Sequence, residues 1–299
     1  MASPPVPQDL STPLARLLDV EAVGLDSFFG PRRPDGTGRV FGGQLIAQGL
    51  QAAQRSVPAD KVAHALHARF LWPGKQALPI LYRVERDHDG RSFAGRRVVA
   101  WQEDRPIFQM TAGFQRPEAG LHHQLPMPDV PGPDTLRSDA ELRREIADGL
   151  PERARAAFLR PSLIELRPVT PPGWADRTPR APVQHHWFRA APVGDDPALH
   201  RAILAYASDT VLLSTALLPH GVHWATDRVQ AASLDHALWL HAPCRADDWL
   251  LYTADSPWAG HGRGFSRGRI YTQAGQLVAS VAQEALIRRI SQVRAADSR

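Results

Sequence analysis

The chain has 299 residues, of which 43% are hydrophobic and 22% charged, so it is neither disordered, fibrous nor a coiled coil. Its 35 basic and 31 acidic residues are spread along the chain, and a formal net charge of only +4 argues against a nucleic-acid binder. Cys244 is the only cysteine, which excludes an intrachain disulfide and a cysteine-based zinc site.

The same features give expectations about location. Residues 1–8 are rich in proline and lack a basic flank and an apolar run, so we expect no signal peptide there. No apolar stretch reaches the roughly 18 residues that a membrane-spanning helix needs. A single cysteine is typical of a reducing compartment. We therefore expect a cytoplasmic protein that binds neither a membrane nor nucleic acid.

The first part of the chain predicts a short helix, a strand and a buried helix. Ser11-Thr12-Pro13 is a helix start signal, so a helix is expected over 14–20, followed by a strand over 25–29. Residues 44–53 are apolar or small on nearly every side, which indicates a helix buried all round. Four strands follow, at 63–71, 78–85, 91–102 and 106–115. Their connections are too short for parallel crossovers, so they predict an antiparallel meander.

The middle of the chain has a different texture. Four prolines between 126 and 133 precede a charged helical stretch at 139–158, which predicts a proline-rich linker with a helix. After it come strands at 163–169 and 185–190, a strongly apolar helix at 199–218, and strands at 229–241, 249–254, 264–272 and 277–287.

The two parts of the chain repeat one order of elements: strand, buried helix, four strands. Four stretches also match residue by residue, namely 79–82 with 249–252, 90–93 with 262–265, 97–98 with 269–270, and 107–113 with 278–284. Such a repeat indicates a duplicated unit. A buried helix wrapped by a curved antiparallel sheet is the hotdog arrangement, so the pattern predicts an α+β double hotdog.

The predicted units follow from this repeat and from the proline-rich stretch. We expect a tail with a short helix at 1–20, an N-terminal hotdog at 21–116, the linker at 117–160, a C-terminal hotdog with the active site at 161–290, and a tail at 291–299.

Motifs in both halves resemble the type II acyl-CoA thioesterases. They lie at 39–44, 64–74, 91–93, 96–98 and 106–108 in the first half, and at 206–209, 234–236 and 264–268 in the second. The resemblance implies a double hotdog enzyme that hydrolyses fatty acyl-CoA to free fatty acid and CoA without a cofactor. Because hotdog sheets pair edge to edge, the two halves can pair within one chain, and we expect a homo-oligomer, a dimer or tetramer, beyond that.

The resemblance also implies a water-activating site at Asp209, Ser233 and Gln283. The hydroxyl position is usually Thr in that family, and a Ser should be less firmly oriented about χ1. From the residues alone, Asp209 lies in an apolar helix, where burial costs free energy and raises the pKa of a carboxyl. An Asp that caps a break in the helix is an equally good interpretation. The first half has no acid near its equivalent place, Gln48 and Gly49, so we expect one active site per chain.

Other side chains are weaker candidates. Gly42 and Gly43 allow close backbone approach, either to a ligand or for helix–sheet packing. His64 lies where this family often has a histidine, and is either catalytic or a polar core residue. Five arginines near the strands could bind CoA phosphates or lie on a solvated surface, namely Arg91, Arg96, Arg97, Arg263 and Arg267. We expect no metal, because the histidine pairs at 122–123 and 185–186 lack acidic ligands nearby.

Two other functions stay open. Residues 264–268 fit the G-x-S-x-G pattern, in which Ser266 would be a nucleophile on a strand–turn–helix elbow. Residues 269–272 continue as strand, so we interpret the motif as a glycine-eased strand bend. The other function is a non-catalytic acyl-CoA binding or scaffold protein of the same fold.

Overall fold

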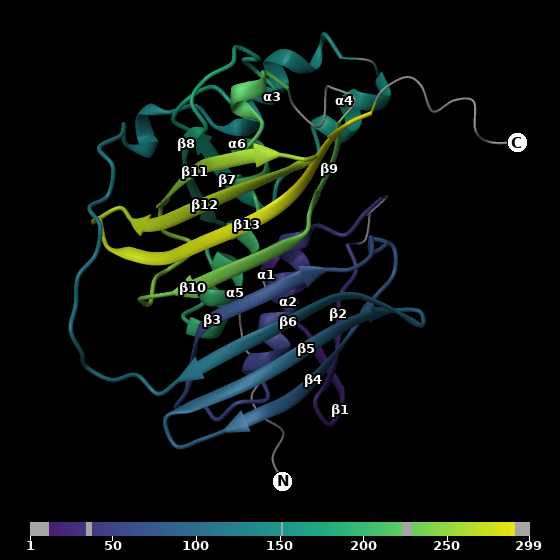
Figure 1. Cartoon of the computed structure of the whole chain (residues 1–299), viewed down its shortest axis with the longest axis vertical. Coiled ribbons are helices and arrows are strands. Elements are labelled where there is room, and N and C mark those ends of the chain that lie inside the picture. Colours follow the sequence, from purple (N-terminus) through teal and green to yellow (C-terminus); the bar gives the residue numbers. More distant parts are fainter. Residues whose placement is uncertain (1–11, 34–37, 151, 223–228, 291–299) are drawn as a thin grey trace, which may run out of the picture.

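One continuous antiparallel sheet passes through both halves of the chain (Figure 1). The structure is a computed structural model in which residues 12–33, 38–150, 152–222 and 229–290 are described. Residues 1–11 of the predicted N-terminal tail and the whole predicted C-terminal tail, 291–299, therefore lie outside the described residues.

The first half contains the elements that its sequence predicts, with one addition. They are α1 (Pro13–Leu18), β1 (Glu21–Gly24), β2 (Ser27–Gly30), α2 (Gly42–Gln54), β3 (Val62–Phe70), β4 (Ile80–Asp89), β5 (Phe93–Gln102) and β6 (Arg105–Gln115). The Thr12 hydroxyl caps α1 by accepting the Ala15 N–H. The single strand expected over 25–29 is instead a hairpin of β1 and β2, because Asp26 adopts a left-handed conformation (φ 55°) and reverses the chain.

The second half repeats this order. It contains β7 (Ile164–Pro168), β8 (Val183–Ala190), α5 (Pro197–Ser208), α6 (Leu212–Thr215), β9 (Val229–Ser233), β10 (Asp235–Leu240), β11 (Leu250–Gly260), β12 (Arg263–Thr272) and β13 (Leu277–Arg289). The expected double hotdog is confirmed. Tyr82 and Tyr252, which match in the repeat, are both fully buried, and each donates its hydroxyl to the central helix of its own half, to Gln48 Oε1 and to the Ser208 carbonyl.

The halves meet where β3 pairs with β10, and the strand order is β1-β2-β4-β5-β6-β3-β10-β13-β12-β11-β8-β7. At this joint Ala237 lies opposite His67, Leu238 opposite Leu66, and His236 opposite Ala68. The central helices α2 and α5 pack side by side against the sheet (Figure 1). One hydrophobic core therefore spans both halves.

Two elements of the second half are interrupted where the sequence predicts continuity. The apolar helix expected over 199–218 ends at Ser208, with Asp209 as its C-cap, and resumes as α6. The Thr210 hydroxyl donates to the Ala207 carbonyl of α5, which competes with regular helix geometry. The strand expected over 229–241 is broken at Leu234, because the Asp235 carboxylate, rather than a backbone carbonyl, accepts the Glu284 N–H.

If α5, the break after it, α6 and the residues up to His220 are taken together, the helical run Pro197–His220 is long and apolar enough to cross a membrane, by length and composition alone. This corrects the expectation that no stretch of the chain reaches that length. In the fold, 78% of its most apolar window is buried inside the protein, because the run is the core helix of the second half.

The predicted linker packs against the second half. The Gln124 side chain bonds Gly275 O and the Leu277 N–H, and Pro131 O accepts the Trp187 indole N–H. The helix expected over 139–158 is two helices, α3 (Asp139–Ala147) and α4 (Glu152–Phe158). A capping box of Ser138 and Glu141 starts α3.

Arg96 fastens the end of α2 to the sheet. Its side chain is buried, and its N–H groups donate to the Ser56 hydroxyl and carbonyl, to two further carbonyls, and to Asp89 Oδ1 at 2.6 Å. The expectations that Arg96 binds phosphate or lies on a solvated surface are therefore both wrong, since it is enclosed and its donors are used within the fold.

Arg96→Met should lower the free energy of unfolding by about 3 kcal/mol, because it leaves several acceptors unpaired. Arg97→Met is the matched control, because Arg97 points to the opposite face and forms a half-exposed ion pair with Glu85, which is worth less than about 1 kcal/mol. Urea unfolding at pH 7 measures both variants. Equal losses would contradict the structural role of Arg96.

Candidate active site

Asp209 lies between the two central helices. It caps the C-terminus of α5, and it faces the N-terminus of α2, where the Gly43 N–H donates to its carboxylate. A Cβ added at Gly42 would come within 2.5 Å of Asp209 Oδ2, and one at Gly43 within 2.3 Å of the Tyr206 carbonyl. Only glycines therefore let α2 approach this closely. The partial positive charge at the start of α2 also favours a carboxylate there.

The structure brings the other two predicted site residues to the same carboxylate. Ser233 Oγ donates to Asp209 Oδ1 at 3.1 Å, and Gln283 Nε2 donates to Ser233 Oγ at 3.1 Å. Ser233 ends β9 beside the strand break, whereas Gln283 is buried on the inner face of β13. The Ser233 hydroxyl is held by two hydrogen bonds, so it is oriented without the methyl group of a Thr.

Burial determines how Asp209 titrates. Removal from water raises the pKa of its carboxyl to about 7, although the hydrogen bonds from Ser233, Gly43 and Gln283 oppose this rise. A carboxyl with a pKa near neutrality is suited to general base catalysis, because about half of it is ionised at pH 7 and the ionised form accepts a proton readily.

One neighbour of this cluster has no assigned role in the sequence prediction. His236 Nδ1 lies 2.7 Å from Gln283 Oε1, and its Nε2 lies 2.8 Å from Ser208 Oγ. The histidine belongs to the motif at 234–236, and it alternates with Leu238 on the inner face of β10. The sequence signal that could have identified His236 is a polar ring on an otherwise apolar face of a strand.

Several weaker candidates lie elsewhere. His64 packs on Phe93 (ring centroids 6.1 Å apart), six residues along β3 from Phe70, whose ring lies near Gly42. Six strand residues span roughly 20 Å, so His64 is not part of the Asp209 cluster. Besides Arg96, three of the predicted phosphate-binding arginines form ion pairs, namely Arg97 with Glu85, Arg263 with Glu284, and Arg267 with Asp255.

The structure has no nucleophile elbow at Ser266. Residues 263–272 form one strand, β12, and Ser266 is a buried residue within it, directly opposite Gln283 of β13. The serine-nucleophile alternative is therefore overturned. As expected, the stretch 264–268 continues as strand, and a local irregularity of the pairing lies on the partner strand, between Asp255 and Trp258 of β11.

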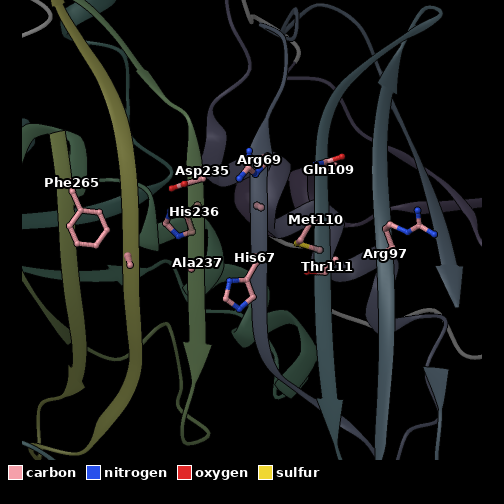
Figure 2. Close-up of a pocket in the computed structure, with 12 residues that line it drawn as sticks. His67, Arg69, Arg97, Gln109, Met110, Thr111, Asp235, His236, Ala237 and Phe265 are labelled. Atoms are coloured by element: carbon pink, nitrogen blue, oxygen red, sulfur yellow. The ribbon is translucent and has the colours of Figure 1, made fainter. Parts of the chain in front are cut away.

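A groove of about 490 Å³ lies on the outer face of the sheet, across the joint of the two halves (Figure 2). Side chains such as His67, Arg69 and Gln109 line it. His236 contributes to its floor, but the imidazole of His236 bonds to partners on the inner side. The groove is thus separate from the Asp209 cluster. Within the described part of the chain, no three His, Cys, Asp or Glu side chains are grouped to hold a metal ion.

The fold and the cluster together define a double hotdog protein with one buried acid–hydroxyl–amide group between its central helices. Family models for the acyl-CoA thioesterase N-terminal and C-terminal domains match residues 31–115 and 128–287. The chain belongs to the acyl-CoA thioesterase family.

Individual relatives agree. The chain is 39% identical to human acyl-coenzyme A thioesterase 8, covering 94% of this chain and 91% of that protein. It is 35% identical to acyl-CoA thioesterase 2 of Haemophilus influenzae, covering 94% and 98%. Among solved structures, acyl-CoA thioesterase II TesB2 of Mycobacterium marinum is similar with a TM-score of 0.75 and 37% identity, covering 93% and 99%.

The pKa of Asp209 predicts how stability depends on pH. Its folded-state pKa of about 7 lies above the ordinary value of 3.8, so the folded protein binds this proton more tightly than the unfolded chain. The resulting stabilisation is complete below pH 4 and is lost as the pH rises through 7. Relative to Asp209→Asn, the wild type should lose about 4 kcal/mol between pH 4 and pH 8. Parallel stability curves for the two proteins in chemical unfolding would contradict this.

Proposed function

We propose that this chain hydrolyses fatty acyl-CoA thioesters to a free fatty acid and CoA, with Asp209 as the base that activates water. The observation that carries the proposal is the hydrogen-bonded group of Asp209, Ser233 and Gln283 at the N-terminus of α2. The relatives named above, which are acyl-CoA thioesterases by name, support the choice of substrate.

In this mechanism the Asp209 carboxylate removes a proton from a water molecule as the water oxygen attacks the thioester carbonyl carbon. Ser233 and Gln283 hold the carboxylate, and with it the water, in the attacking position. The developing oxyanion lies at the N-terminus of α2, where the partial positive charge of the helix favours it. When the carbon–sulfur bond breaks, the proton on Asp209 passes to the departing CoA thiolate. A thioester is electrophilic enough that no covalent enzyme intermediate is needed.

The proposal places one active site in each chain, because only the second half carries the acid. Tyr82 bonds Gln48 as Tyr252 bonds Ser208, so Gly49 is the counterpart of Asp209. Helix α2 continues through Gly49, whereas α5 stops at Ser208. The homo-oligomer and the cytoplasmic location expected from the sequence remain proposals as well.

Asp209→Asn should lower kcat by about 100-fold or more, because the amide cannot accept the proton of water. Release of CoA from acyl-CoAs of several chain lengths, detected with a thiol reagent, measures this. Asp196→Asn is the matched control, because Asp196 caps the other end of α5 and Asn caps equally well.

In the wild type, kcat/KM should rise with pH through about 7 as Asp209 ionises. No CoA release at any chain length would contradict hydrolysis, and tight acyl-CoA binding without turnover would favour the non-catalytic alternative. Full activity of Asp209→Asn would show that the base lies elsewhere.

Ser233→Ala should lower kcat by about 100-fold, because Asp209 loses a hydrogen bond and Gln283 loses its acceptor. Ser233→Thr should stay within about threefold of the wild type, since the hydroxyl is already fixed by two partners and a rotamer preference adds little. Steady-state kinetics of both variants test this. A large gain for Ser233→Thr would show that the serine hydroxyl is poorly oriented.

A further inference from the structure

We infer that His236 is a positioning residue for this site: with its proton on Nδ1, it fixes the amide orientation of Gln283 and thereby the direction of every hydrogen bond that leads to Asp209. The inference rests on the proposed role of Asp209. His236 touches neither water nor substrate in this scheme, and it acts only through Gln283.

The direction of the bonds follows from which atoms can donate. An ionised Asp209 only accepts, so Ser233 must donate to it and must itself accept from Gln283. Gln283 therefore presents Nε2 to Ser233 and Oε1 to His236. Because an amide oxygen only accepts, His236 Nδ1 must carry a proton.

The other side of the imidazole completes the chain. Burial lowers the pKa of His236 to about 4, so the ring is neutral at pH 7 and its Nε2 accepts a hydrogen bond. Ser208 Oγ, 2.8 Å away, is the donor, so its single proton points to His236 Nε2 and not to the Ala205 carbonyl, which also lies 2.8 Å from Ser208 Oγ. The bonds then run in one direction, from Ser208 through His236, Gln283 and Ser233 to Asp209. Hydrogen bonds aligned in this way polarise and strengthen one another.

Without His236 the Gln283 amide is free to turn over. The flipped amide would present Oε1 to Ser233, whose hydroxyl would then donate to Gln283 instead of to Asp209. The carboxylate would lose the hydrogen bonds from Ser233 and Gln283 that oppose the rise in its pKa, and only the one from the Gly43 N–H would remain. His236 and Gln283 are each only 1% exposed, so water cannot readily replace the lost contact.

The first half shows that the hotdog fold does not need a histidine here. The joint pairs His236 with Ala68 and, symmetrically, Leu238 with Leu66, so Leu66 is the counterpart of His236. His67 and Ala237 are counterparts, and on the next strand His67 pairs with Thr111 as Ala237 pairs with Ala282. The residues that follow these partners, Ala112 and Gln283, are therefore counterparts too. Apolar residues fill both places in the half that lacks the acid. His236 is therefore present only in the half that also has Gln283 and Asp209.

Among the residues that the structure describes, few titratable groups face this network. Asp235 neighbours His236 on β10 and favours its protonation, while Tyr206 on α5 and Tyr252 on β11 surround Asp209. The positive charge of Arg33 lowers the pKa of Tyr206 by less than burial raises it. Burial raises the pKa of both phenols, so they stay neutral. The rise of kcat/KM with pH on the acid side therefore measures the ionisation of Asp209.

The test compares His236→Leu, which copies Leu66, with His236→Asn, whose amide N–H replaces the donor at Nδ1. In His236→Leu the acid limb of kcat/KM should move up by about one pH unit and kcat at pH 7 should fall about tenfold. His236→Asn should restore most of the wild-type profile. Leu66→Ala is the control, because it disturbs the same core layer on β3 and should leave the acid limb in place.

Two measurements keep the inference separate from the proposed function. A ¹³C NMR titration of the Asp209 carboxyl reports its pKa whether or not the protein hydrolyses acyl-CoA. The ¹⁵N spectrum of the wild type shows which ring nitrogen of His236 carries the proton, even if His236→Leu does not fold. A proton on Nε2, or an Asp209 that titrates in His236→Leu as in the wild type, would overturn the inference. Loss of turnover in the wild type alone would overturn only the proposed function.

Discussion

The burial of one carboxylate, that of Asp209, explains much of the local structure around it. A buried carboxylate is costly unless donors surround it. Here the donors come from three directions: the first turn of α2, the end of β9, and the inner face of β13. The break in α5, the break between β9 and β10, and the glycine pair that starts α2 each bring one of these groups within reach. Burial raises the pKa of Asp209 and these hydrogen bonds lower it, and the balance leaves the pKa near neutrality.

The two halves share one fold, and the residues of the proposed active site lie where the halves differ. Both halves wrap a sheet around a helix and anchor a buried tyrosine on it. In the first half, the helix runs on past the anchor. In the second, it stops there, and Asp209 occupies the first position outside it. The substitution of polar for apolar residues at Leu66/His236 and Ala112/Gln283 follows the same division.

Sequence periodicity and the repeat were sufficient to predict the double hotdog and nearly all of its strands, because each buried helix and each strand has its own local pattern. The family resemblance was needed to select Asp209, Ser233 and Gln283, which are separated by up to 74 residues. What could not be predicted depends on contacts between distant segments. The strand break at Leu234 and the burial of Arg96 are both caused by partners that no local pattern contains, whereas the helix break at Ser208 confirms the interpretation of Asp209 as a cap. The role inferred for His236 depends likewise on the directions of hydrogen bonds.

The covalent joining of the two hotdogs has an evolutionary consequence. In a symmetric homodimer of single hotdogs, every substitution appears on both sides of the interface, so an acid introduced on one helix would also appear on the other. A duplicated chain is free of this restriction. Here one copy contributes Gly42 and Gly43 at a helix start, and the other contributes the acid that faces them. Joining the halves in one chain thus allows two equivalent surfaces to differ and to complement each other.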